Sequence, residues 1–316
     1  MKEIGGYFEL EKYTGREYHE NALALNTGRN CLRYVIRTKH IKKLALPLYN
    51  CDVVEETARE EGVQISYYDV EMNLKPLVSN IDDDTWLYII NYFGQNTEFI
   101  KEITKHKIHV IVDNAQAFFT DAIEGIDTLY TCRKYFGVPD GAYLYTHVSL
   151  QILKEDHSCD RMKWINGRYE YTAANFFDDY KLSEDRLQFL PILRMSKLTH
   201  NLLRPINYNA IRRAREDNFN HLKTALDCKN QLKLITPKGP YMYPLLLAPE
   251  KAEKLRHYLI ENCIYSATLW PNLLNLDHRG TAYRLAQGIV TLPCDQRYTE
   301  ADMDHIIKTV CKGLEV

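Results

Sequence analysis

The chain has 316 residues, of which 45% are hydrophobic and 26% charged, and its formal net charge is −2. This length fits one large domain and one smaller one, and the composition is ordinary for a globular protein. The balanced charge gives no electrostatic footprint for binding nucleic acid or an anionic membrane. The first residues form no apolar leader, and no window approaches the roughly 18 apolar residues of a membrane span, so we expect neither a signal peptide nor a membrane span.

Residues 1–20 are polar and aromatic, and we expect them to form an arm that packs on another surface. From there to residue 147, short apolar runs alternate with helical patterns. This repetition predicts an α/β fold with a mostly parallel sheet between helices. The predicted strands are 43–47, 63–70, 87–91, 108–112, 126–131 and 141–147, the last closing the sheet, and the predicted helices are 30–37, 51–62 and 97–106.

The pattern changes after residue 147, where residues 150–200 are helical, charged and irregular. The clearest later break is Arg204-Pro205, so we place a large domain at 1–205 and a small one at 206–316. The small domain is predicted to be α+β, with helices at 207–226, 249–262 and 299–313 and strands at 241–247 and 264–268.

Two chemically interesting residues follow neighbouring predicted strands. Asp113 ends the strand at 108–112, and Lys134 comes just after the strand at 126–131. Ligands of open α/β sheets bind at such strand ends. An acid and a lysine there suit pyridoxal phosphate, because the lysine forms a Schiff base and the acid keeps the pyridine ring protonated. Each residue alone also has a simpler interpretation, a solvated loop lysine and a strand-end turn or helix cap.

Two further features fit the same cofactor. Gln116 lies one turn beyond Asp113, where its amide would reach the ring hydroxyl, and Arg133 beside Lys134 favours an uncharged amine. Thr27-Gly28-Arg29 opens a predicted helix, whose free N–H groups and hydroxyl would bind a phosphate, although Thr27 could also be a simple N-cap. A dinucleotide-binding dehydrogenase is disfavoured because no Gly-x-Gly-x-x-Gly follows the first strand.

Together these motifs resemble the nucleotide-sugar (DegT-type) aminotransferases, which are fold type I pyridoxal-phosphate enzymes. The specific part is Asp-x-x-Gln at 113–116 followed by a lysine at 134, in the order of the family's Asp-Ala-Ala-Gln-Ala and Ser/His-x-x-Lys segments. Weaker similarities lie at 5–11, 26–32, 46–51, 91–95 and 288–300. The resemblance implies a seven-stranded, mostly parallel sheet with a smaller C-terminal α+β domain, and a homodimer whose active site lies at the subunit interface.

The resemblance also implies roles for individual residues. Lys134 would be the catalytic Schiff-base lysine and proton shuttle, with Asp113 on the pyridinium and Gln116 on the ring hydroxyl. The family's ring-stacking aromatic aligns with Cys51, and Tyr49 is a possible substitute two residues away. The residues implied to hold the phosphate are Thr27, Gly28, Arg29 and Thr131.

The sequence departs from the family at two places near this site. The Gly-Glu-Gly-Gly run after the lysine is replaced by Gly137-Val-Pro-Asp-Gly141. The asparagine that reaches the partner subunit's phosphate in the family would fall at 192–194, where none is present, and Asn201 and Asn207 are the alternatives. We also expect the arginines at 212, 213 and 215 to form a solvated helix face or, alternatively, to contact a sugar-nucleotide diphosphate.

The implied activity is transfer of an amino group, from glutamate, to a keto sugar nucleotide in surface-polysaccharide or modified-sugar biosynthesis. Relatives that dehydrate sugars carry histidine at the position of Lys134, so the lysine favours transamination. The alternative is a degenerate relative that acts as a binding partner in the same pathway.

The eight cysteines include no Cys-x-x-Cys pair and no Cys/His group at zinc spacing, so we expect no metal site and reduced, mostly buried thiols in a cytoplasmic protein.

Overall fold

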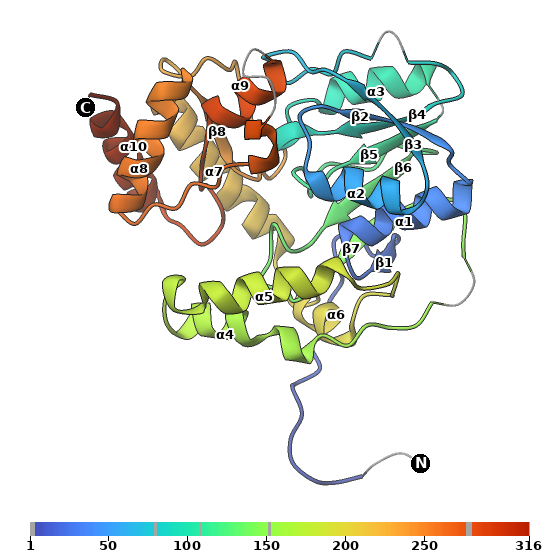
Figure 1. Cartoon of the computed structure of the whole chain (residues 1–316). Coiled ribbons are helices and arrows are strands. Elements are labelled where there is room, and N and C mark those ends of the chain that lie inside the picture. The colour runs from blue at the N-terminus through green and yellow to red at the C-terminus, as the bar shows by residue number, and fades with distance from the viewer. Residues whose placement is uncertain (1–3, 79–80, 108, 151–152, 276–279, 316) are drawn as a thin grey trace.

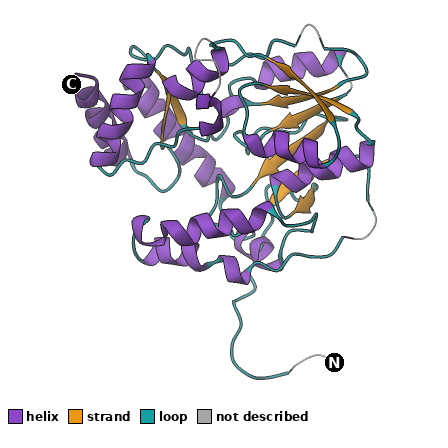
Figure 2. Ribbon diagram, in the orientation of Figure 1, coloured by secondary structure: helices purple, strands orange, loops and turns teal. Residues whose placement is uncertain are grey.

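The computed structural model describes residues 4–78, 81–107, 109–150, 153–275 and 280–315. A seven-stranded sheet forms the centre of the N-terminal part, and its strand order is β1-β7-β6-β5-β4-β2-β3 (Figure 1). Figure 2 shows a second pair of strands, β8 and β9, among the C-terminal helices. The predicted α/β class and the seven-stranded sheet are therefore confirmed.

The sheet is parallel from β3 to β6 and antiparallel at its other end. The central strands β2, β4 and β5 have the buried, apolar character of strands covered on both faces, whereas β3 at the edge is mostly exposed. The prediction for β2 is correct to the residue, and the other predicted strands of this sheet differ by at most two residues at either end. Ile108, where one predicted strand begins, lies outside the described residues. The bounds are β1 (Leu23–Leu25), β2 (Lys43–Pro47), β3 (Gln64–Tyr68), β4 (Trp86–Ile90), β5 (Val110–Asp113), β6 (Asp127–Thr131) and β7 (Ala142–Tyr145).

The edge of the sheet differs from the prediction. We expected the strand at 141–147 to be the last strand on this side of the sheet. Instead β1 pairs antiparallel with that strand, β7, and forms the edge. A strand of three residues is too short to show alternation in the sequence. Its pairing is decided by the tertiary fold.

Three helices connect the parallel strands: α1 (Gly28–Lys39), α2 (Asp52–Glu60) and α3 (Thr97–His106). Residues 30–36 of α1 are all buried, so the middle of the helix is enclosed on every side, and His40 ends the helix in the left-handed conformation. Gly62 follows α2 with a φ of +70°, which a glycine adopts at little cost. These helices were predicted within three residues of their observed ends.

The segment between the sheet and the C-terminal part is helical, as predicted. It contains α4 (Lys163–Glu170), α5 (Phe177–Gln188) and α6 (Lys197–Leu203), which lie beside β1 and β7 in Figure 1. The C-terminal part follows a break at residues 204–207 and consists of α7 (Tyr208–Leu226), β8 (Tyr243–Leu246), α8 (Pro249–Glu261), α9 (Thr281–Gly288), β9 (Ile289–Leu292) and α10 (Glu300–Glu315).

The strand predicted at 264–268 is wrong. β8 pairs instead with β9, which the sequence analysis did not recognise. Within 264–268 only Ile264 is fully buried, and the carbonyl of Ala267 accepts a hydrogen bond from the hydroxyl of Thr291 in β9. The segment therefore runs beside the sheet without joining its ladder.

All eight cysteines lie in described residues and are free thiols. The expectation that most are buried is wrong, since only Cys31, Cys132 and Cys294 are buried, and three others are exposed. Within the described residues, no helix is long and apolar enough to cross a membrane.

An aromatic core surrounds His19 where the N-terminal arm meets the sheet. His19 is buried among Phe118, Tyr130 and Tyr143. Its Nε2 lies 2.8 Å from the carbonyl oxygen of Phe118, which can only accept, so Nε2 carries the proton. Nδ1 then accepts from the Tyr145 hydroxyl at 3.2 Å. Burial lowers the pKa of His19 to about 4, although the Phe118 bond favours the charged form.

This buried histidine predicts a loss of stability in mild acid. Because its folded pKa lies below the ordinary value of 6.5, its contribution is complete above pH 6.5 and is lost as the pH falls toward 4. Between pH 7 and pH 5 the free energy of unfolding should fall by about 2 kcal/mol more in the wild type than in His19→Gln. Urea unfolding at the two pH values measures this, with exposed His147→Gln as the control. Parallel pH dependence in wild type and His19→Gln would contradict it.

Candidate active site

Asp113 ends β5, and its carboxylate is firmly held. The backbone N–H of Ala115 donates to Oδ1 at 2.7 Å, and the hydroxyl of Tyr88 donates to Oδ2 at 2.7 Å. Asp113 is 8% exposed, so the carboxylate is almost enclosed but still reachable. Ionised oxygens with fixed donors suit a cationic ring nitrogen as a further partner.

Gln116 lies beside Asp113 and presents an unpartnered amide. Its Oε1 accepts from the backbone N–H of Phe93 at 2.9 Å, and this bond fixes which end of the amide faces Phe93. Phe93 has a φ of +51°, a strained conformation for a non-glycine residue. Nε2 of Gln116 is buried and has no hydrogen-bond partner among the described residues. A buried donor of this kind requires an acceptor, such as a ring hydroxyl of a bound group.

Lys134 lies in the loop after β6, at the same edge of the sheet as Asp113. Its side chain is exposed, and Nζ lies 5.6 Å from the centre of the Tyr241 ring. Its neighbour Arg133 forms an ion pair with Glu184 of α5. Burial lowers the pKa of Arg133 to about 10. The lysine is therefore accessible to a ligand, and Arg133 is engaged with another helix.

The start of α1 is where the sequence predicts a phosphate site. Thr27 is the N-cap, and its hydroxyl accepts from the Asn30 N–H at 3.1 Å. The first N–H groups of a helix have no partners within it, so they remain suited to an anion. The Arg29 guanidinium donates to the carbonyl of Gln188 at 2.8 Å, which ties this turn to the end of α5. Thr27 thus caps the helix, and the capping and phosphate interpretations are compatible.

The two candidates for contact with the cofactor ring occupy different positions. Tyr49 is fully buried and packs on Tyr92 and Trp270, with ring centres 5.2 and 4.4 Å away. Cys51 is half-buried at the start of α2, where burial raises the pKa of its thiol to about 11. The positive charge of Lys134 acts on this pKa in the opposite direction.

The altered loop at 137–141 is anchored by Asp140. Its buried carboxylate accepts from the Ser196 N–H at 2.9 Å and the Ser196 hydroxyl at 2.8 Å, and it also bonds the Thr199 hydroxyl. These bonds fix the loop to the start of α6. Gly141 has a φ of +115°, and its N–H donates to the carbonyl of Asn26 at 2.6 Å. The loop therefore joins the segment after Lys134 to the residue before Thr27.

The two alternative asparagines have partners in their own chain. Asn201 holds the N-terminal arm, since its Oδ1 accepts from the Tyr13 N–H at 2.9 Å and its Nδ2 donates to the Glu11 carbonyl at 2.7 Å. Asn207 caps α7 through a 3.1 Å bond from the Ala210 N–H. Both amides thus have structural roles in the single chain.

The arginine cluster on α7 is not uniformly solvated, which corrects the expectation for Arg215. Its side chain is 1% exposed, whereas Arg213 is exposed. Arg215 donates to Gln296 at 2.7 Å, to the carbonyl of Pro240 at 2.8 Å and more weakly to that of Tyr135, and it stacks on the Tyr135 ring. It therefore joins the residue after Lys134 to the loop that carries Tyr241.

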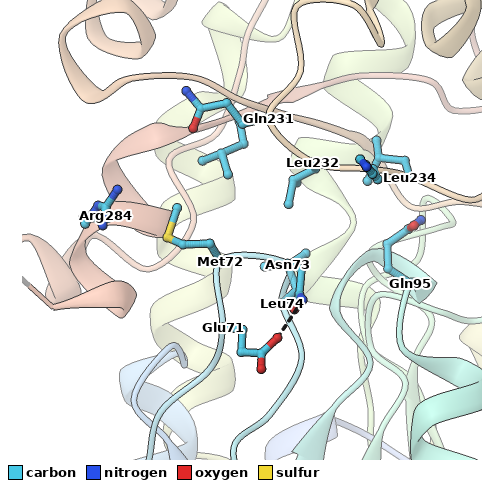
Figure 3. Close-up of a pocket in the computed structure, with 11 residues that line it drawn as sticks. Glu71, Met72, Asn73, Leu74, Gln95, Gln231, Leu232, Leu234 and Arg284 are labelled. Carbon is cyan, nitrogen blue, oxygen red and sulfur yellow. Dashed lines mark hydrogen bonds between the residues drawn. The ribbon is translucent and has the colours of Figure 1, made fainter.

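A cavity of about 510 Å³ lies where the two parts of the chain meet (Figure 3). Gln95 borders it and bridges to the C-terminal part, because its amide exchanges two hydrogen bonds with the backbone of Ile235, at 2.9 and 3.0 Å. The predicted site residues are all described, and none lines this cavity. The lining residues are Glu71, Met72, Asn73, Leu74, Gln95, Gln231, Leu232, Lys233, Leu234, Leu246 and Arg284.

Tyr88 and Tyr241 contact the site residues but were not predicted. Tyr88 had a weak signal, since a hydroxyl within the buried run of β4 must find a partner. Tyr241 had none, because it approaches Lys134 from the C-terminal part through the tertiary fold.

These residues fit pyridoxal phosphate. Asp113 offers a carboxylate for the ring nitrogen, Gln116 an unpaired donor for the ring hydroxyl, α1 an anion-binding end, and Lys134 an accessible amine. Asp113 and Lys134 follow adjacent parallel strands and so meet at one edge of the sheet.

Solved structures share the fold of this chain, although no protein-family profile and no curated protein sequence matches it. The sugar aminotransferase CalS13 from Micromonospora echinospora is 13% identical, with a TM-score of 0.64 over 93% of this chain and 88% of that one. NtdA from Bacillus subtilis, with bound cofactor PMP, is 13% identical, with a TM-score of 0.67 over 93% and 73%. A DegT DnrJ EryC1 StrS aminotransferase from Brucella abortus is 15% identical, with a TM-score of 0.61 over 92% and 85%.

The chain therefore has the fold type I architecture of the pyridoxal-phosphate aminotransferases, as the sequence predicted. Its relatives in structure are sugar aminotransferases of the DegT type.

Proposed function

We propose that the protein is a pyridoxal-phosphate-dependent sugar aminotransferase. The observation that carries this is the joint position of Asp113 and Lys134 at the ends of adjacent strands, within a fold shared with sugar aminotransferases. The unpartnered amide of Gln116 beside them supports the same cofactor. We further propose a division into a large domain at 1–205, which holds the cofactor, and a small domain at 206–316.

Each site residue then has a defined task. Bound pyridoxal phosphate would carry the amino group and serve as the electron sink. Lys134 would hold its aldehyde through Nζ and later move the proton at the substrate carbon that bears nitrogen. Asp113 would keep the ring nitrogen protonated, and Gln116 would donate to the ring hydroxyl. The phosphate would be bound by Thr27, Gly28, Arg29 and Thr131, and the ring would be contacted by Cys51, with Tyr49 buried behind it against Tyr92 and Trp270.

The proposed substrates are a keto sugar linked to a nucleotide and an amino-acid donor, glutamate. The Lys134 side chain is exposed beside Tyr241 of the C-terminal part, so its amine is accessible to a substrate. The product would be an amino sugar used in surface-polysaccharide or modified-sugar biosynthesis. We propose that the enzyme acts in the cytoplasm, where sugar nucleotides are available.

We also propose that the protein is a homodimer. The arm projects from the rest of the molecule (Figure 1), and the side chains of Tyr7 and Phe8 are each 99% exposed. Apolar residues also lie exposed on and beside the α4–α5 hairpin, including Tyr169, Phe177 and Phe189. Exposed apolar groups of this extent favour burial against another protein surface. A second copy of the chain is the proposed partner.

An absorbance spectrum tests the function directly. Purified protein supplied with pyridoxal phosphate should show a visible band, and glutamate should replace it with a band at shorter wavelength. A nucleotide-linked keto sugar should then restore the first band. A protein that gains no visible band would overturn the proposal and favour a cofactor-free partner protein. A band that persists with glutamate but responds to another amino acid would change only the donor.

A further inference from the structure

The Asp113 carboxylate has a fixed donor on each oxygen. The Ala115 N–H at Oδ1 comes from the local turn, so any strand-end aspartate could have it. The Tyr88 hydroxyl at Oδ2 comes from the neighbouring strand β4, so it depends on the pairing of β4 with β5. Two donors on two oxygens restrict the carboxylate to one orientation.

Tyr88 is itself rigidly held. It lies in the middle of β4, two residues before Ile90, which pairs with Asp113, so Tyr88 and Asp113 point to the same face of the sheet. The side chain is 2% exposed. The carbonyl of Tyr88 also accepts a 2.7 Å hydrogen bond from the Tyr68 hydroxyl of β3. Burial holds the ring of Tyr88, and the strand pairing with the Tyr68 bond holds its backbone.

The hydroxyl remains a donor over the whole working pH range. Burial and the negative charge of Asp113 raise the pKa of Tyr88 well above its ordinary value. A neutral phenol therefore faces an ionised carboxylate, which gives a charge-assisted hydrogen bond.

We propose that Tyr88 is a positioning residue for the cofactor, because its hydroxyl holds the Asp113 carboxylate in the orientation that receives the ring nitrogen of pyridoxal phosphate. This deepens the proposed function and rests on it. Without the hydroxyl, Oδ2 has no fixed donor, and the carboxylate must be ordered when the cofactor binds. The cost of that ordering and the lost hydrogen bond should appear as weaker cofactor binding.

The experiment compares Tyr88→Phe with Tyr68→Phe. Each variant keeps its ring and loses one buried hydroxyl that donates at 2.7 Å, but only Tyr88 contacts Asp113. The proteins, freed of cofactor, are titrated with pyridoxal phosphate and with its analogue in which carbon replaces the ring nitrogen. We expect Tyr88→Phe to weaken binding of pyridoxal phosphate roughly tenfold or more, and Tyr68→Phe to change it less than about threefold.

The analogue separates positioning from general damage to the fold. Because it has no ring nitrogen for Asp113, wild type and Tyr88→Phe should bind it with nearly equal affinity. An equal loss for both cofactors, or unchanged binding of pyridoxal phosphate, would overturn the inference and leave the proposed function intact. A wild-type protein that binds neither cofactor would overturn the proposed function as well.

Discussion

Replacing Lys134 by alanine is expected to lower the rate of transamination by at least about a thousandfold, because the variant loses both the amine that binds the cofactor aldehyde and the proton shuttle. The wild-type side chain is exposed, and its Nζ lies beside the Tyr241 ring at the rim of the site. The fold should therefore survive the change. Borohydride treatment of the cofactor-loaded protein makes the bond between lysine and cofactor permanent. Peptide mass spectrometry then shows whether the cofactor is attached to residue 134.

A matched control is Lys42→Ala. Lys42 is also exposed, but it precedes β2 at the amino end of the parallel strands, on the opposite edge of the sheet from Asp113. Its loss should leave both the attachment and the rate unchanged. If Lys134→Ala still transaminated at the wild-type rate, or if borohydride fixed the cofactor on another lysine, the assignment of Lys134 would be wrong.

The largest expected effect on stability comes from Arg215→Met. The variant leaves the carbonyls of Pro240 and Tyr135 and the Gln296 amide without their buried charged donor. Removing one partner from a buried, charged hydrogen-bond network costs about 3 kcal/mol of unfolding free energy. Urea and thermal unfolding measure the change.

The neighbouring Arg213 provides the comparison, because it lies on the same helix and is exposed. Arg213→Met should alter the free energy of unfolding by less than about 0.5 kcal/mol. Equal unfolding midpoints for the two variants would mean that the Arg215 network contributes nothing to stability. Arg215→Met should also weaken pyridoxal phosphate binding, because Arg215 holds two segments beside Lys134. These are the loop that contains Tyr135 and the loop that contains Pro240 and Tyr241.

The comparison between sequence and structure is clearest along the sheet. The apolar runs at β2, β4 and β5 are strong local signals, because a strand buried on both faces is continuously hydrophobic. The chain order of strand and helix then restricts the topology to a mostly parallel sheet. β1, with three residues, carries no comparable signal, and its partner β7 is distant in sequence. β9 is an apolar run as long as β5, so it had a local signal, but the strand was predicted at 264–268 instead.

For the site, the sequence by itself determined the pair Asp113 and Lys134, because both follow strands whose ends must meet at one edge of the sheet. It also determined the start of α1, where a threonine before a glycine begins a helix. Only the tertiary structure decided that Tyr88 holds the Asp113 carboxylate and that Tyr241 lies beside Lys134. It also decided that Arg215 is buried between the loops of Tyr135 and Pro240. These contacts join residues 25 to more than 100 positions apart, so no local pattern of residues can specify them.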